Sequence, residues 1–211
     1  MLRFKEDGTL DKERDILVLK TELEYENVFD LKELYKSLHF WLEEEGFQTD
    51  VDAQPASGGD LNFKEVLYWE RVNEAGMTDH HAWWRVVRYP SGTTPKNAYH
   101  RLFFRINLQT IAMSKAEILH EKKKVKVDKG DVIVRLEAWL QIDYRNEFQK
   151  HAFLKQIDWL FRKKIWRDQI EVLKEDARKT AYRLQQHIKE YLELVQPYPQ
   201  ARLFHPYKGY K

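Results

Sequence analysis

The chain has 211 residues, of which 36 are lysine or arginine and 34 are aspartate or glutamate. This length suits one domain with long appendages, and the near balance of charge predicts no strong electrostatic field for nucleic acid or for an anionic membrane. Because the chain has no cysteine, disulfides, cysteine nucleophiles and thiolate metal sites are excluded.

The N-terminal part is predicted to be a polar extension over residues 1–15, because it is rich in charge and lacks the apolar run of a signal peptide. Hydrophobic and charged side chains alternate over 16–26, which predicts the first strand. A helix is expected to follow over 29–47. Asp30 can cap its N-terminus, and Gly46 can end it in the left-handed conformation.

Five further strands are predicted after a loop that contains Ser57-Gly58-Gly59. The last one is the clearest, because apolar or aromatic side chains occupy every second position of DVIVRLEAWLQIDY. Asp128-Lys129-Gly130 has the composition of a tight turn, so a hairpin is expected between the last two strands. The five strands are predicted over 62–73, 81–89, 99–112, 115–127 and 131–144.

Helical periodicity resumes at residue 147 and continues to about residue 195, with a break near 166–169. Short turns favour antiparallel strands, and the apolar face of such a sheet needs helices to cover it. The predicted fold class is therefore α+β. We expect an antiparallel sheet of about six strands, covered by one N-terminal helix and long C-terminal helices, in a single domain over 16–195.

This order of elements resembles the START-like, helix-grip superfamily: a strand, the helix at Asp30–Glu45, a meander that ends in DVIVRLEAWLQIDY, and a long helix. The segments DLKELYKSLHFWLEEEGF and LQIDY are also similar to uncharacterised archaeal proteins. The resemblance implies an apolar cavity, gripped between sheet and last helix, that holds a lipid or another apolar small molecule. Packing of the same side chains into a solid core is the alternative, and both stay open. The residues that would line the cavity are Tyr35, Leu38, Phe104, Leu108, Leu136, Leu140 and Tyr144.

Aromatic side chains in polar surroundings indicate a contact surface for a partner. Phe103 and Trp139 lie on otherwise polar strand faces beside arginines. The tail over 196–211 begins with prolines and is expected to be extended, so it can dock into a groove or pack on its own sheet. Its aromatic residues are Tyr198, Phe204, Tyr207 and Tyr210. We expect an interaction protein, a subunit of a homo-oligomer or of a larger assembly; carriage of an apolar small molecule is the alternative.

Sites for catalysis or for a metal have little support in the sequence. Asp79 and His81 are candidate metal ligands, because they point to the same side of an extended segment, but a surface turn explains them as well. Glu137 and Asp143 lie on the polar strand face beside Arg135 and Arg145. Paired carboxylates could serve acid–base catalysis, but cross-strand salt bridges are the simpler expectation. No phosphate loop, nucleophile elbow or HExxH pattern occurs, so no catalytic residue and no cofactor are predicted. Nucleic acid is not an expected partner, no apolar run is long enough to span a membrane, and the cytoplasm is the expected location.

Overall fold

The computed structural model describes residues 15–49, 65–93, 97–120, 123–144, 148, 151–160 and 164–192. Apart from Asp15, the predicted N-terminal extension lies outside the described residues, and so does the whole predicted tail over 196–211. The elements in chain order are β1 (Asp15–Phe29), α1 (Leu31–Glu44), β2 (Gln48–Thr49), β3 (Glu65–Val72), β4 (Thr78–Arg88), β5 (His100–His120), β6 (Lys123–Ile142), α3 (Ala152–Leu160) and α4 (Arg167–Tyr191). The predicted α+β class is confirmed.

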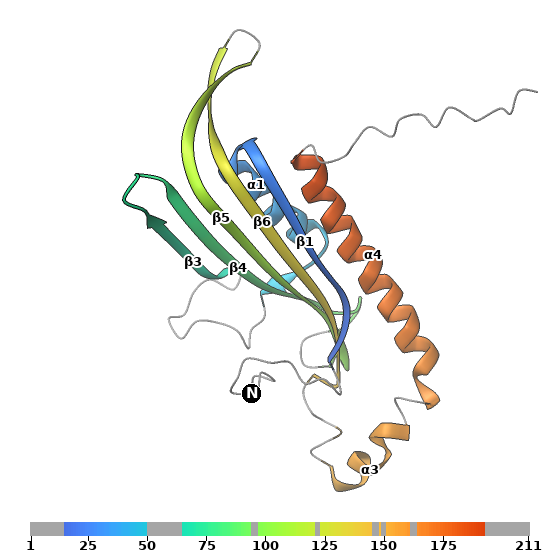
Figure 1. Ribbon diagram of the computed structural model, residues 1–211. Helices are drawn as coiled ribbons and strands as arrows, with labels where there is room; N and C mark the ends of the chain where they lie inside the picture. The colour runs from blue at the N-terminus through green and yellow to red at the C-terminus, as the bar shows by residue number, and fades with distance from the viewer. Residues whose placement is uncertain are drawn as a thin grey trace, which may run out of the picture.

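The six described strands form one antiparallel sheet in the order β1-β6-β5-β4-β2, with β3 also paired to β4. The long β5–β6 ladder lies in the middle, and its hairpin continues past the neighbouring strands (Figure 1). The first strand, β1, pairs with the last strand, β6, and forms one edge of the sheet.

The predicted hairpin at Asp128-Lys129-Gly130 is wrong, because β6 runs straight through these residues and β5 continues to His120. Gly130 does not form a turn; it allows β5 and β6 to approach each other closely. The ladder has a bulge between Ile111 and Ser114, and a Cβ atom at Gly130 would lie 2.7 Å from the Met113 sulfur and 3.0 Å from the Ile111 carbonyl oxygen. Glycine is the residue that such a close backbone approach requires.

Helix α1 has the ends that its sequence predicts. The Asp30 carboxylate accepts a hydrogen bond of 3.0 Å from the Glu33 backbone N–H, which satisfies one of the free donors of the first turn. Gly46 adopts φ 75°, where a side chain would be strained. The chain then turns back, so that the buried Phe47 packs 4.6 Å from the Phe104 ring on β5. The cap and the glycine therefore direct α1 onto the sheet.

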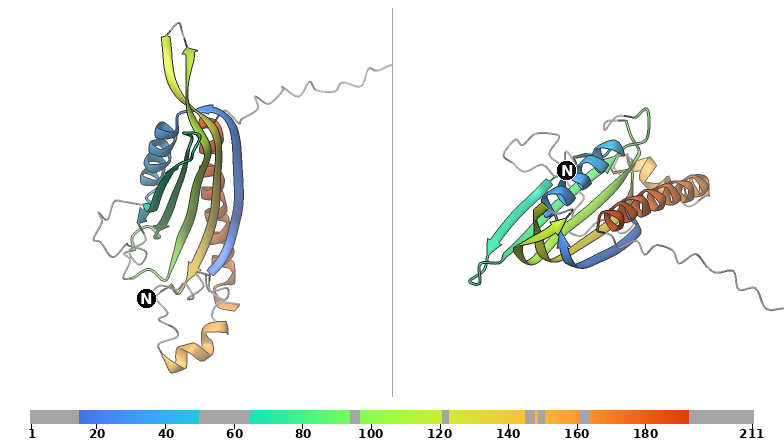
Figure 2. Two further views of the ribbon diagram at one scale, coloured as in Figure 1. Left: turned by 60° about the vertical axis from the view of Figure 1, so that its left-hand side comes forward. Right: turned by 90° about the horizontal axis from the view of Figure 1, so that it is seen from above.

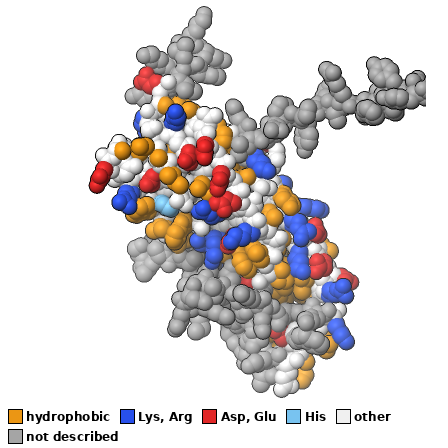
Figure 3. Space-filling model, viewed as in Figure 1, with side chains coloured by type: hydrophobic (Ala, Val, Ile, Leu, Met, Phe, Trp, Pro, Cys, Tyr) orange, Lys and Arg blue, Asp and Glu red, His pale blue; other side chains and the backbone are white. Residues whose placement is uncertain are grey.

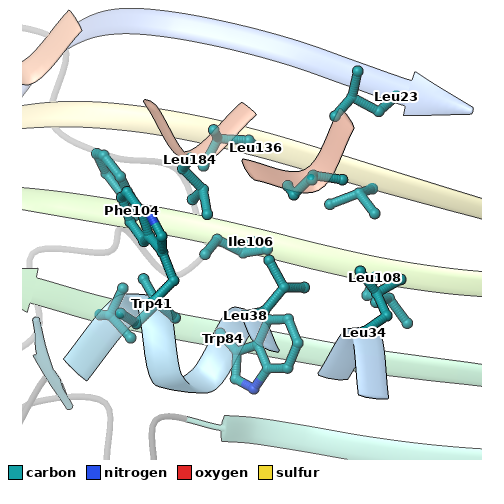
Figure 4. Close-up of a cluster of buried hydrophobic side chains, with 14 of the residues drawn as sticks. Leu23, Leu34, Leu38, Trp41, Trp84, Phe104, Ile106, Leu108, Leu136 and Leu184 are labelled. Atoms are coloured by element: carbon teal, nitrogen blue, oxygen red, sulfur yellow. The ribbon is translucent and has the colours of Figure 1, made fainter. Parts of the chain in front are cut away.

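Helices α1 and α4 cover the same side of the sheet, as the right-hand view of Figure 2 shows. Their apolar stripes share one buried cluster with the inward side chains of β4, β5 and β6 (Figure 4). Leu38 of α1 and Leu184 of α4 are fully buried there. The cluster includes Leu34, Leu38, Trp41, Leu42, Trp84, Phe104, Ile106, Leu108, Leu136, Ala181 and Leu184.

Arg88 joins the sheet to both helices at one end of this core. Its guanidinium lies 3.2 Å from Glu45, just after α1, and 2.9 Å from Asp176 of α4. It also donates to the Thr180 hydroxyl at 3.1 Å. Because one side chain contacts three elements, it fixes how α1 and α4 lie relative to β4.

Candidate functional site

The side of the sheet opposite α1 and α4 is covered by none of the described helices, and we call it the open face. Side chains alternate along each strand, so the register of the ladders assigns the residues of this face. They include Lys20, Glu22, Glu24 and Glu26 of β1, Lys129, Asp131, Ile133, Arg135, Glu137, Trp139 and the buried Gln141 of β6, the buried Arg101 and Phe103 with Arg105, Asn107, Gln109 and Ile111 of β5, His81, Trp83, Arg85 and the buried Val87 of β4, and Leu67 and Trp69 of β3. Figure 3 looks onto this face.

Glu137 is the centre of a network of charges in the middle of the open face. Lys20 Nζ lies 3.1 Å from one of its carboxylate oxygens, and Arg105 Nη1 lies 3.3 Å from the other. The indole N–H of Trp139 also donates to this carboxylate, at 3.4 Å. Burial raises the pKa of Glu137, but the hydrogen bond from Lys20 and the charge of Arg105 outweigh it and hold the pKa below its usual range. The predicted cross-strand salt bridging of Glu137 is confirmed.

A second ion pair lies beside this network. Arg135 Nη2 lies 2.8 Å from the Glu22 carboxylate, and Arg135 Nη1 donates to the side-chain oxygen of Gln109 at 3.0 Å. A cavity of about 280 Å³ opens between the two ion pairs. Its walls combine both signs of charge with amide groups, so a polar side chain of a binding partner fits its chemistry better than an apolar ligand does. The lining residues are Lys20, Thr21, Glu22, Arg105, Asn107, Arg135 and Glu137.

Arg85 brings a further positive charge to the basic end of the open face. It lies directly opposite Arg105 in the β4–β5 ladder, and like charges in that position destabilise a sheet. Burial and repulsion from Arg105 lower the pKa of Arg85 to about 10, against the attraction of Glu137. Its guanidinium donates to the Asn107 side-chain oxygen at 2.9 Å and to the Trp84 carbonyl at 2.8 Å. Within the described part of the chain, no carboxylate oxygen lies within 4.0 Å of it.

The opposite end of the open face is acidic. Glu26 of β1 lies directly opposite Asp131 of β6, and Glu24 is two residues before it on the same side. Among the described lysines and arginines, none comes within 4.0 Å of these three carboxylates. In Figure 3 red side chains gather over the upper half of the face, with blue ones directly beneath them. The two ends therefore carry opposite net charge, although Lys129 lies two residues before Asp131 on the same side of β6.

Apolar side chains lie along the outer hairpin of the same face. Trp69, Trp83 and Leu67 remain 44%, 40% and 38% exposed, although they are large and neighbouring. The Trp69 ring lies 5.1 Å from the His81 ring, and the Arg85 guanidinium lies 5.8 Å from the Trp83 ring. Exposed tryptophan beside arginine is typical of the centre of a protein–protein interface.

The partner-binding residues that the sequence predicts fall in different places. Trp139 is partly exposed on the open face, next to Glu137. Phe103 lies on the same face but is 1% exposed, packed with Val87 and Trp139, so it is not accessible to a partner in this structure. The four aromatic residues of the predicted tail lie outside the described residues, and their role stays a prediction.

The residues predicted to line a ligand cavity belong to the packed core or to its margin. Leu38, Phe104, Leu108 and Leu136 are part of the main buried cluster, and Tyr35 packs against it. Leu140 belongs to a smaller buried cluster, and the Tyr144 ring lies 5.9 Å from the Tyr89 ring. A cavity of about 80 Å³ lies between the sheet and α4, with Leu102, Leu140 and Leu173 in its walls. This volume is well below the roughly 300–1,000 Å³ of typical small-molecule sites.

Asp79 has a structural role in the described fold. Its carboxylate accepts a hydrogen bond of 2.8 Å from the backbone N–H of Ala112, which has φ 54° and lies at the β5 bulge. His81 packs against Trp69 on the open face. The part of the chain that the structure describes holds no cluster of three or more histidine, aspartate or glutamate side chains suited to a metal ion. The metal site stays a prediction, and the contacts of both residues are explained without it.

Apart from Trp139 and the salt bridging of Glu137, the charged pairs and tryptophans of the open face were missed in the sequence, because each pair joins strands far apart in the chain. The alternation of charge along 20–26 and 131–137 was the available signal, but the partner of each residue depends on the register. Comparison with protein family models, curated proteins and solved structures finds no match for this chain. None of the described helices combines the length and apolar character needed to cross a bilayer.

Proposed function

We propose that this chain is an interaction protein that binds another protein subunit on its open face. The observation that carries the proposal is the combination of exposed tryptophans with positioned arginines on the side of the sheet that none of the described helices covers. Such side chains contribute most of the binding energy in many interfaces when a partner excludes water from them. The cavity beside Glu137 adds a polar recess into which a partner's side chain fits.

The preorganised charges support binding of a protein rather than of an apolar small molecule. Arg105, Lys20 and Arg135 are already held by Glu137, Glu22 or Gln109, so little side-chain entropy remains to be lost on association. Charged groups arranged in this way favour a partner with a complementary pattern and disfavour others.

The helix-grip relationship is likewise a proposal. It is supported by α4, which lies along β1 and β6 on the same side as α1 (Figure 1). In that architecture the space between sheet and last helix holds an apolar ligand, and carriage of such a ligand remains the alternative function. The closely packed cluster around Leu38 and Leu184 favours the interaction protein.

Photo-crosslinking from the open face tests the proposed function. The photoreactive residue p-benzoylphenylalanine replaces Trp83 in one variant. In the control variant it replaces Phe40 of α1, whose side chain is 60% exposed. Irradiation of the purified chain and of an extract containing it should give one discrete adduct from position 83 and none from position 40. Mass spectrometry then gives the mass and identity of the attached protein. If position 83 gives no adduct, or both positions give the same ones, the proposal is wrong.

A further inference from the structure

Resting on the proposed function, we infer that the subunit bound by the open face is a second copy of this chain, related to the first by a two-fold axis. Such an interface is self-complementary, because the same patch is contributed by both copies. The open face has the distribution of charge that this symmetry requires: one basic end and one acidic end.

Two cross-strand pairs of like charge carry the inference. Arg85 lies directly opposite Arg105 at the basic end, and Glu26 lies directly opposite Asp131 at the acidic end. Each pair is unfavourable within a single chain. Glu137 offsets part of the repulsion at the basic end, because it pairs with Arg105, whereas in the described part of the chain Arg85 and the Glu26–Asp131 pair form no ion pair of their own. When the acidic pair of a second copy packs against the basic pair of the first, the opposite charges attract and both repulsions decrease. Because of the two-fold symmetry, the same contact forms at both ends of the interface.

The sheet geometry allows both contacts together. Asp131 lies opposite Ile111 on β5, and Arg105 lies six residues before Ile111 on the same strand. At about 3.3 Å per residue, the two pairs are roughly 20 Å apart along the strands. A two-fold axis parallel to the sheet, midway between the pairs and perpendicular to the line that joins them, places each pair over its opposite in the other copy.

The same axis also covers the exposed tryptophans. It runs across the strands toward the β3–β4 hairpin, so Trp69 and His81 of the two copies meet near the axis, and Trp83 approaches the exposed Ile111 of the other copy. Burial of these rings supplies the apolar centre of the contact. The charged ends then set the register of the two faces.

Charge-reversal variants test this inference by sedimentation equilibrium. Glu26→Lys places a lysine against the arginine pair of the other copy, and the dimer dissociation constant should rise about tenfold or more. Arg85→Glu should weaken the dimer in the same way. An equimolar mixture of Asp131→Lys and Arg85→Glu should restore association, because the axis lays position 131 over position 85 and each reversed residue then meets an opposite charge in its partner. Glu44→Lys, at the exposed C-terminal end of α1, makes the same change of charge away from the open face and should leave the dimer unchanged.

Several results would overturn the inference. A wild-type chain that stays monomeric would contradict the second copy. A dimer that Glu26→Lys weakens no more than Glu44→Lys does would contradict it too. Because Arg85 is half-buried, its variant needs a check of folding by circular dichroism; Asp131→Lys, at the acidic end, must weaken the dimer whether or not Arg85→Glu folds. If crosslinking from position 83 yields an adduct with a different protein while the chain stays monomeric, the proposed function stands and the second copy is excluded.

Discussion

Leu38→Ala should lower the free energy of unfolding by about 2–5 kcal/mol, as expected when a fully buried leucine leaves a cavity. Leu38 has no exposed surface and packs in the cluster that joins α1 to β4, β5 and α4. The interior is close-packed, so its neighbours can fill the space only in part. Chemical denaturation followed by circular dichroism measures the change.

Phe40→Ala on the same helix is the matched control. Phe40 is 60% exposed, so its truncation should change stability by less than about 0.5 kcal/mol. Equal losses for the two variants would show that α1 does not pack through the Leu38 side, which would contradict the layer arrangement. A small loss of stability in both variants would mean that the side chains beneath α1 are loosely packed, as a ligand cavity in the carrier alternative requires.

Glu137→Gln should have the largest effect among single changes on the open face. Its carboxylate accepts from Lys20, Arg105 and Trp139, and hydrogen bonds to charged groups contribute roughly 1.5–3 kcal/mol. The neutral amide leaves these cations close together without the charge that holds them. We expect a loss of roughly 2 kcal/mol at neutral pH by the same denaturation measurement, with no loss of secondary structure.

The pH dependence of this loss has a definite sign. Because the pKa of Glu137 is lower in the folded chain than in the unfolded one, its contribution to stability is complete above the unfolded value and is lost as pH falls through the folded value. The difference between wild type and Glu137→Gln should therefore shrink as pH falls below 4.5, the ordinary value of this carboxyl. Glu171→Gln is the control for an exposed ion pair: Lys174 also lowers the pKa of Glu171, so its difference has the same sign but should be much smaller, because the pair lies on the surface of α4. A difference that grows in acid would contradict the network.

The fold could be predicted well where local pattern and tertiary structure agree. Alternation along 131–142 places β6, and the cap at Asp30 and the glycine at position 46 delimit α1 to within a few residues. The hairpin at Gly130 was predicted wrongly, because a glycine that allows close packing of strands has the same local signature as one that makes a turn. That distinction depends on Met113, which lies on the neighbouring strand.

The candidate site was harder to predict than the fold. The alternating pattern predicts Trp139 on a polar face and salt bridging of Glu137, but it does not predict that Lys20 and Arg105 are the partners of Glu137, because both are far from it in the sequence. The pairs Arg85–Arg105 and Glu26–Asp131 join residues that only the ladder registers bring together, and no periodicity specifies a register between distant strands. Pairing of β3 on the far side of β4 likewise brings Trp69 beside His81. Long-range pairing therefore determines the site, whereas local pattern determines the elements.

Disulfide trapping tests the two-fold contact most directly, and the absence of cysteine from the chain makes it specific. An Asp131→Cys chain and an Arg85→Cys chain are oxidised separately and as an equimolar mixture, then separated on a denaturing gel without reductant. Positions 131 and 85 face each other across the axis, because the axis keeps the order of the strands, so the mixture should give a disulfide-linked dimer and each chain alone should give little. No linked dimer in the mixture, or equal yields in all three samples, would contradict a second copy on the open face.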